Sequence, residues 1–118
     1  MSNIFVFGSN LRGIHGAGAA AYAREHHGAV MGVGHGRTGD SYAIPTKDTR
    51  IDTLPLRSIR IFMKHFIEYA TQHPELSFQV TAIGCGLAGY TPEQIAPMFK
   101  GAPSNCVFDE RFLPFLKD

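Results

Sequence analysis

Two clusters of glycine and a lysine between them are the residues of this chain whose spacing could support chemistry. Nine of the thirteen glycines lie in residues 8–39, three more lie in residues 84–89, and residues 40–83 contain none. Because glycine lets backbone N–H groups approach a ligand closely, each cluster could hold a phosphate or a pyrophosphate. Lys47 lies in the stretch without glycine. Its amine could attack a carbon atom when uncharged, or pair with a phosphate when protonated.

The composition places these residues in one small domain. The chain has 118 residues, of which 44% are hydrophobic and 18% charged, so we expect it to bury about two-thirds of its unfolded surface. The formal net charge is +1 and the lysines and arginines are scattered, which argues against a long nucleic-acid footprint but leaves a small nucleotide or a modified chain end as a partner. Cys85 and Cys106 lack metal-binding spacing, so we expect reduced thiols and no metal.

The chain shows no sign of a membrane segment. No apolar run approaches the roughly twenty residues that cross a bilayer. The N-terminal residues lead directly into a strand pattern, without the charged and apolar regions of a signal peptide. We therefore expect a cytoplasmic protein that does not contact membranes.

Strands and helices that alternate along the chain must position the candidate residues. Short apolar runs bounded by glycine, proline or turn residues predict strands over residues 3–8, 29–33, 41–44, 78–83 and 106–108. Alanine-rich sequence or helical spacing predicts helices over residues 17–27 and 55–72, from residue 91 onward, and after residue 109. Thr91, Pro92 and Gln94 form a capping-box pattern. This alternation predicts an α/β fold with a mixed sheet.

The ends of the predicted strands bring three segments to one rim. Ligands of open α/β sheets bind at the carboxyl ends of the strands. Residues 9–10, 46–48 and 84–90 each follow a predicted strand directly. Because Pro45 is expected to halt its strand, residues 46–48 are expected to form a turn that carries Lys47. The three segments should therefore line one cleft.

The first glycine cluster does not fit the standard nucleotide-binding motifs. Residues 16–21 match GxGxxA, but residues 9–15 separate that match from the preceding strand, and no acid ends the next strand. The GxxxxGK[ST] motif is absent, which argues against a P-loop NTPase. What remains is a loop and a helix N-terminus that could bind a diphosphate through backbone groups.

The order of these segments resembles that of macro domains, a family with an α/β/α fold that binds ADP-ribose. Asn10 with the glycine- and alanine-rich residues 13–20 resembles their first loop, and residues 84–90 resemble their second, phosphate-binding loop. Residues 44–47, Ile-Pro-Thr-Lys, resemble a turn in the branch that removes ADP-ribose from protein carboxylates and DNA bases. In that branch the matching lysine is implicated in catalysis. The resemblance covers residues 3–99 and implies a compact three-layer α/β/α sandwich, in a single domain over residues 1–118.

The resemblance also implies an ADP-ribosyl glycohydrolase that uses no cofactor and no metal. Lys47 and Asn10 would be its catalytic residues: Asn10 orients the distal ribose, and Lys47 attacks or stabilises the anomeric carbon. The substrate would be an ADP-ribosyl group on a DNA base or a protein. Ligand contact is implied for Ser9, Asn10, Gly16, Ala17, Gly18, Thr46, Gly84, Cys85, Gly86, Leu87, Ala88, Gly89 and Tyr90.

Two departures from the family pattern keep other functions open. The sequence has no counterpart of the family's first strand, whose terminal Gly-Asp helps to recognise adenine, and Ala88 stands where the protein-directed members carry an aspartate. The DNA-directed members lack that aspartate too. The alternative function is a binding or sequestering module for an ADP-ribose-like or cyclic nucleotide, without turnover. A third interpretation is an interaction module in which the glycine loops only form compact turns.

Several residues near these segments have both a functional and a structural interpretation. Asn10 could bond a ribose hydroxyl or close its own loop as an Asx turn. Cys85 could be a reactive thiol or a small packed side chain. Tyr90 could stack on the ligand or pack beneath its loop, and His15 could contact the ligand or donate a proton to it.

Other polar residues are expected to be structural or solvated. Asp48 and Asp52 have no fixed separation, so we expect turn residues rather than a catalytic pair. Residues 34–40, with His35 and Arg37, form either a flexible lid or a solvated connection. The outer face of the 55–72 helix is expected to be solvated; it carries Arg57, Arg60, Lys64 and Glu68.

Overall fold

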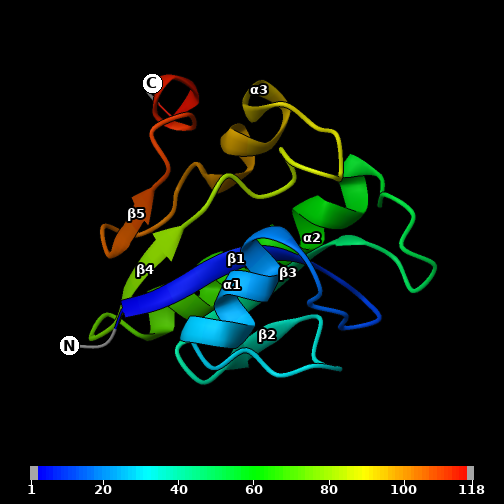
Figure 1. Ribbon diagram of the computed structural model, residues 1–118. Helices are drawn as coiled ribbons and strands as arrows, with labels where there is room; N and C mark the ends of the chain where they lie inside the picture. Colours follow the sequence, from blue (N-terminus) through cyan, green and yellow to red (C-terminus); the bar gives the residue numbers. More distant parts are fainter. Residues whose placement is uncertain (1–2, 117–118) are drawn as a thin grey trace.

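A mixed sheet of five strands forms the centre of the molecule (Figure 1). The computed structural model describes residues 3–116. The strands follow the order β2-β3-β1-β4-β5, in which β2 is antiparallel to β3 and the others run parallel. Their bounds are β1 Asn3–Asn10, β2 Gly36–Thr38, β3 Ser41–Lys47, β4 Ser77–Val80 and β5 Cys106–Phe108. The predicted α/β fold with a mixed sheet is confirmed.

Different helices cover the two faces of this sheet. The helices are α1 Gly18–His26, α2 Leu56–Gln72 and α3 Pro92–Ile95, with the 3-10 helices η1 Ala96–Phe99 and η2 Leu113–Phe115. Because side chains alternate along a strand, β1 places Ile4 and Val6 in the cluster that includes α2, whereas Phe7 packs with Ala20 and Ala23 of α1. In Figure 1, α1 lies in front of the sheet and α2 behind it. Within residues 3–116, no helix is long and apolar enough to cross a membrane.

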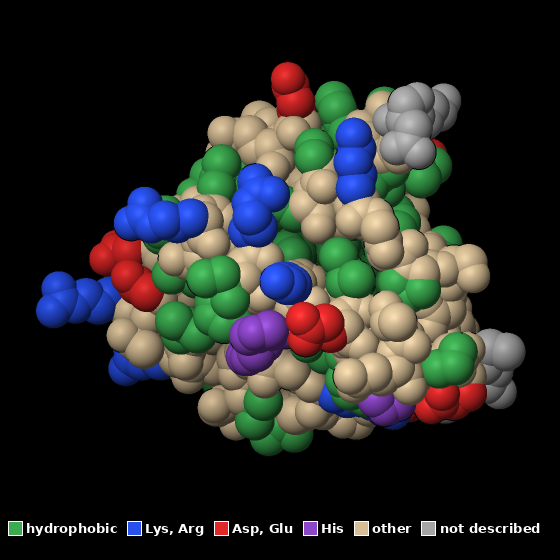
Figure 2. All heavy atoms as spheres, turned by 180° about the vertical axis from the view of Figure 1, so that it is seen from behind, with side chains coloured by type: hydrophobic (Ala, Val, Ile, Leu, Met, Phe, Trp, Pro, Cys, Tyr) green, Lys and Arg blue, Asp and Glu red, His purple; other side chains and the backbone are tan. Residues whose placement is uncertain are grey.

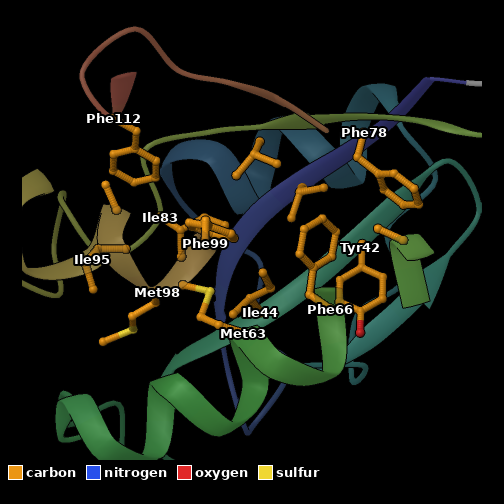
Figure 3. Close-up of a cluster of buried hydrophobic side chains, with 14 of the residues drawn as sticks. Tyr42, Ile44, Met63, Phe66, Phe78, Ile83, Ile95, Met98, Phe99 and Phe112 are labelled. Atoms are coloured by element: carbon orange, nitrogen blue, oxygen red, sulfur yellow. The ribbon is translucent and has the colours of Figure 1, made fainter. Parts of the chain in front are cut away.

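The helix predicted over residues 55–72 is α2, and it supplies a large apolar face of the core. Ile59, Met63, Phe66 and Ala70 recur at helical spacing and are fully buried. Figure 3 shows Met63 and Phe66 pointing into a cluster of side chains from the sheet and from η1. Burial of one large apolar side chain contributes on the order of 1.5–3 kcal/mol. This face therefore holds α2 firmly against the strands whose ends carry the candidate residues.

The predicted capping box at residues 91–94 is confirmed as the start of α3. The Thr91 hydroxyl accepts a hydrogen bond from the Gln94 backbone N–H at 3.3 Å, and the Gln94 side-chain oxygen accepts one from the Thr91 N–H at 3.0 Å. The helix is short because Pro97 follows within η1. The helix predicted over residues 17–27 and the strand predicted over residues 106–108 are confirmed as α1 and β5.

The strand predicted over residues 29–33 is wrong, because these residues form a packed turn. The His15 ring nitrogen Nε2 lies 3.1 Å from the Val30 carbonyl oxygen and 3.0 Å from that of Val33, so these carbonyls bond to a side chain rather than to a strand. Backbones also meet closely here: a Cβ atom on Gly13 would lie 2.3 Å from the carbonyl carbon of Gly32. The edge position in the sheet is taken instead by β2, which lies in a stretch predicted to be a loop.

The third predicted strand continues through Pro45 as β3 and ends at Lys47. Proline lacks an N–H group and is confined to sheet edges and bulges. Here β2 pairs only with residues 41–43 of β3, and the register with β1 shifts between Ser9 and Asn10, beside Pro45. Lys47 is therefore the last residue of a strand rather than part of a turn. It forms an antiparallel bridge with Thr53, which folds the intervening residues back toward the sheet.

Candidate ligand-binding pocket

A pocket of about 490 Å³ opens at the carboxyl ends of β1, β3 and β4. Its lining combines the segments that follow these three strands with the first turn of α1 and with Arg111, which follows β5. Twelve of the fourteen predicted site residues line it: Ser9, Asn10, Gly16, Ala17, Gly18, Thr46, Lys47, Gly84, Cys85, Gly86, Leu87 and Ala88. Gly89 and Tyr90 lie outside the lining. The fold thus brings segments that are far apart in sequence into one cavity.

Asn10 and Lys47 are neighbours in the lining of this pocket. They are paired residues of the parallel strands β1 and β3, and the Leu11 N–H donates to the Lys47 carbonyl oxygen at 2.9 Å. The Asn10 side chain closes the following loop: its Nδ2 donates to the Ile14 carbonyl at 2.9 Å, and its Oδ1 accepts from the Ile14 N–H at 3.0 Å. An amide has two N–H donors and two acceptor lone pairs, so Asn10 keeps one of each for a ligand.

The Lys47 side chain has no ionic partner within residues 3–116. The ion pairs in that range join His26 to Glu25, Arg37 to Asp40, and Arg111 to Asp109. Lys47 is half-buried and its Nζ forms no hydrogen bond to a described residue. A cation that lines a pocket without a carboxylate beside it favours an anionic ligand.

The N-terminus of α1 faces the pocket without a cap. Its N-cap residue, Ala17, offers no side-chain acceptor, and its first turn contains no acidic residue. Gly18, Ala19 and Ala20 of that turn line the pocket. The first N–H groups of a helix have no partner within the helix, and they carry the positive end of its dipole. By contrast, the α3 N-terminus is capped by Thr91. The α2 N-terminus, with Pro55 as its N-cap, also lacks a side-chain cap, but it lies outside the pocket lining.

The second glycine loop presents further backbone donors. Within residues 84–90, the N–H groups of Cys85, Gly89 and Tyr90 bond to carbonyls in or beside the loop. The N–H groups of residues 86–88 donate to no other described residue. A Cβ atom on Gly86 would meet nothing within 4 Å, so this part of the loop faces open space. A row of unpaired amide donors is the arrangement that binds phosphate oxygens.

Two hydrogen bonds fix the second loop to the segment that follows Lys47. The Thr53 hydroxyl donates to the Ala88 carbonyl at 3.1 Å, and the Tyr90 hydroxyl donates to the Leu54 carbonyl at 2.5 Å. Tyr90 also packs against the core cluster, in agreement with the interpretation that it lies beneath its loop. Because Thr53 pairs with Lys47, the lysine and the donor row belong to one connected framework.

Arg111 is a pocket residue that sequence reasoning missed. Its Nε and Nη2 donate to the two carboxylate oxygens of Asp109 at 2.9 and 3.1 Å. The hydrogen bonds from Arg111 lower the pKa of the Asp109 carboxyl, so the pair is ionised at neutral pH. Residue 111 falls in the helix predicted after residue 109, and nothing in the local pattern relates it to the distant glycine loops.

The ionisable groups of the lining carry no negative charge. Among the described lining residues there is no aspartate, glutamate or histidine. Besides the cations Lys47 and Arg111, the lining contains the thiol of Cys85. Burial raises the pKa of this thiol, with Arg111 acting in the opposite direction. A neutral thiol in a partly buried position agrees with the packed interpretation of Cys85 rather than with a reactive thiolate.

Other residues considered for function lie elsewhere. His15 is fully buried against Phe7 and does not line the pocket. His35 packs on Phe62 and His65 of α2, and the Arg37 guanidinium donates to the Tyr69 hydroxyl at 3.1 Å. The strand β2 is thus fixed to α2, and neither of the two loop interpretations of residues 34–40 describes it.

The turn after β3 is organised by Asp48. Its Oδ1 accepts hydrogen bonds from the backbone N–H groups of Arg50 and Asp52, at 2.8 and 3.0 Å. This confirms Asp48 and Asp52 as turn residues.

Close backbone packing, rather than ligand binding, explains the presence of glycine at some positions of the first glycine cluster. A Cβ atom on Gly34, for example, would lie 1.9 Å from the Asn10 carbonyl oxygen. Of the nine glycines in this cluster, Gly8, Gly16 and Gly18 line the pocket, and the last two are among the predicted ligand contacts.

Comparison of the chain with protein-family models, curated proteins and solved structures found no match. The site must therefore be interpreted from its own residues. In the described part of the chain, no three His, Cys, Asp or Glu side chains gather where they could hold a metal ion. The arrangement that remains is an electropositive pocket between two sets of unpaired amide donors, with one free lysine at the end of a strand.

Proposed function

We propose that the protein binds ADP-ribose or a related nucleotide diphosphate in this pocket and hydrolyses an ADP-ribosyl bond on a macromolecule. The observation that carries the proposal is the convergence of two open donor sets, at the α1 N-terminus and at residues 86–88, on one pocket without carboxylates. Two donor sets suit the two phosphates of a diphosphate. Lys47 and Asn10, which are paired at the ends of β3 and β1, could contact the ribose that is released from the macromolecule.

The arrangement of the elements supports a macro domain-like, three-layer interpretation of the fold. α1 packs on one face of the mixed sheet and α2 on the other. The two loops that resemble the family's ligand loops follow β1 and β4, which are adjacent and parallel. Lys47 is the last residue of β3, the other neighbour of β1. This placement of the segments supports the resemblance.

In the proposed reaction, Asn10 orients the distal ribose and Lys47 acts as the nucleophile. The uncharged amine attacks the anomeric carbon and forms a C–N bond, while the bond from that carbon to the carrier, the DNA base or protein side chain, breaks. The resulting ammonium then loses a proton. Water then displaces the lysine and restores the amine. Because the described lining offers no carboxyl or imidazole group to protonate the leaving group, the reaction suits carriers that leave as anions, such as a carboxylate or an acidic base nitrogen.

A binding module without turnover is the second candidate, and the same lining favours it. No aspartate, glutamate or histidine among the described lining residues is available to activate water. If Lys47 stays protonated in the complex, it pairs with a phosphate of the ligand. The domain then binds or sequesters the ligand without hydrolysing it. Both candidates share the pocket and differ only in the state of one amine.

Turnover assays on ADP-ribosylated DNA and on an ADP-ribosylated protein carboxylate test the proposal. The expected result is release of ADP-ribose by the wild-type protein, with loss of release in Lys47→Arg. Binding of free ADP-ribose without release from either substrate would select the binding module. Release that is unchanged in Lys47→Ala would overturn the role of the lysine.

A further inference from the structure

The outer face of α2 carries a row of cations that no carboxylate neutralises. Arg57, Arg60 and Lys64 are exposed and lie at positions i, i+3 and i+7, which places them on one side of the helix over about 10 Å. None of the three forms an ion pair within residues 3–116. Figure 2 looks onto this side of the molecule and shows several Lys and Arg side chains gathered on it.

This charge arrangement opposes the stability of the helix. α2 begins at Leu56, so Arg57 lies in its first turn, where the helix dipole disfavours a cation, and that turn contains no acidic residue. Arg57 and Arg60 are three residues apart and Arg60 and Lys64 four apart, spacings at which like charges repel. Glu68, the acid on this face, lies four residues after Lys64, a spacing at which opposite charges attract, but the two form no ion pair. A charge pattern that costs stability is expected where a charged partner compensates for it.

The row starts beside the rim of the pocket. The segment that leads into α2 contains Thr53 and Leu54, which bond to Ala88 and Tyr90 of the second loop. The first turn of α2 thus follows directly from the framework that holds Lys47. Arg50 lies in the same region, but Asp48 and Asp52 flank it in its turn, and we do not include it in the row.

We propose that Arg57, Arg60 and Lys64 bind consecutive phosphates of a nucleic-acid backbone, so that α2 docks a nucleic acid next to the pocket. A linear row of cations matches a polymer with regularly spaced charges. A membrane surface fits less well, because the apolar face of α2 is buried in the core and cannot insert among lipids. The inference deepens the proposed function, on which it rests for its role: it selects a nucleic acid as the macromolecule that carries the ADP-ribosyl group.

Fluorescence anisotropy with unmodified 20-nucleotide probes tests the docking surface separately from the pocket. The probes are single-stranded DNA, double-stranded DNA and single-stranded RNA, titrated between 50 and 200 mM salt. Three phosphate contacts predict that log affinity falls with log salt at a slope of about −2.7 for the duplex and about −2.1 for single strands. The variant Arg57→Gln/Arg60→Gln should make the slope shallower by about 1.8 for the duplex, and should weaken binding at low salt roughly tenfold.

A control variant with the same change of net charge makes the test specific. Arg12→Gln/Arg24→Gln removes two exposed cations, one in the first loop and one on α1, and should retain the wild-type slope. Equal loss in both variants would overturn the docking surface, as would absence of salt-dependent binding. Equal binding of polyglutamate or of phosphatidylserine vesicles would also overturn it. Free ADP-ribose, titrated into the same variants, should bind as in wild type. Absence of ADP-ribose binding to the wild-type protein, with salt-dependent binding of the probes retained, would overturn the pocket and leave the surface intact.

Discussion

Asn10 and Lys47 are paired residues at the carboxyl ends of β1 and β3, although 36 residues separate them along the chain. Parallel pairing fixes their relative position through the backbone, and the bond from the Leu11 N–H to the Lys47 carbonyl strengthens it. The amide and the amine are therefore presented together by two central strands rather than by mobile loops. Such placement suits a pair of groups that must act on one sugar.

Substitution of Lys47 separates catalysis from binding. Arginine retains the positive charge but cannot act as the amine nucleophile, so Lys47→Arg should lose turnover and keep much of its affinity for ADP-ribose. If the protein hydrolyses the ADP-ribosyl bond through this amine, turnover by the wild-type protein should increase with pH, because the amine must lose its proton before it attacks. Single-turnover rates measured from pH 6 to 9, with calorimetry on both proteins, check this. A rate that falls with increasing pH would contradict nucleophilic attack by the lysine.

If the domain only binds its ligand, Lys47 has a different expected signature. Lys47→Ala should then weaken ADP-ribose binding by about 1.5–3 kcal/mol, the range for a hydrogen bond to a charged group. Lys47→Arg should restore most of that loss. Calorimetric titration of the two variants measures the difference directly, and equal affinity in wild type and Lys47→Ala would show that the amine does not contact the ligand.

Two neighbouring glycines of the second loop should respond to substitution in opposite ways. A side chain on Gly86 meets open space, so Gly86→Val should fold with near-normal stability while it crowds the donor row. Gly84 has a φ of 79°, and a Cβ atom there would lie 3.1 Å from Ile95, so Gly84→Val should destabilise the fold by about 1–3 kcal/mol. Urea unfolding of both variants checks the contrast. A larger loss in Gly86→Val would contradict the described loop.

Charge reversal on α2 should raise stability while it weakens nucleic-acid binding. Arg57→Glu replaces a cation by an anion in the first turn, which should stabilise the helix by about 0.3–1 kcal/mol. The matched change Arg24→Glu lies in the last turn of α1, where a cation is favourable, and should lower stability by a similar amount. Thermal unfolding of both variants tests the signs. A decrease in melting temperature for Arg57→Glu would contradict the conclusion that Arg57 destabilises the helix.

The Asp109–Arg111 pair should contribute stability that depends on pH. The pKa of Asp109 in the folded protein lies below its ordinary value because Arg111 donates hydrogen bonds to its carboxylate. The contribution is therefore complete above the ordinary pKa of about 4 and is lost as the pH falls through the lower folded value. Asp109→Asn should be less stable than wild type at pH 7, and the two should converge below about pH 4. Glu110→Gln, which removes an adjacent exposed carboxylate, controls for the change in charge.

The sequence was sufficient for the elements with strong local patterns. The apolar period of α2 and the capping box of Thr91 and Gln94 are local properties, and both are as predicted. The segments that carry Asn10, Lys47 and residues 84–88 were also located, because each follows a short apolar run. The strand predicted over residues 78–83 is shorter than expected, because β4 ends at Val80. Local patterns therefore located most residues of the pocket.

The remaining features depend on contacts between distant residues. The apolar residues 29–33 form a turn because His15 bonds to their carbonyls, and β3 passes through Pro45 because its far side has no partner strand there. Gly34 is required by the close approach of the Asn10 carbonyl rather than by a ligand. Arg111 reaches the pocket only because β5 lies beside β4. None of these relationships leaves a local signal in the sequence.

Isothermal titration of the wild-type protein and Gly86→Val with ADP-ribose is the most direct test of the proposed site. The account predicts binding of one ADP-ribose per chain by the wild-type protein, and loss of that binding in a Gly86→Val variant that unfolds at the same urea concentration. ADP and cyclic dinucleotides, titrated in parallel, define which nucleotide the pocket prefers. Absence of ADP-ribose binding to the wild-type protein, or equal affinity in the folded Gly86→Val variant, would contradict the assignment of the second loop as a phosphate-binding loop.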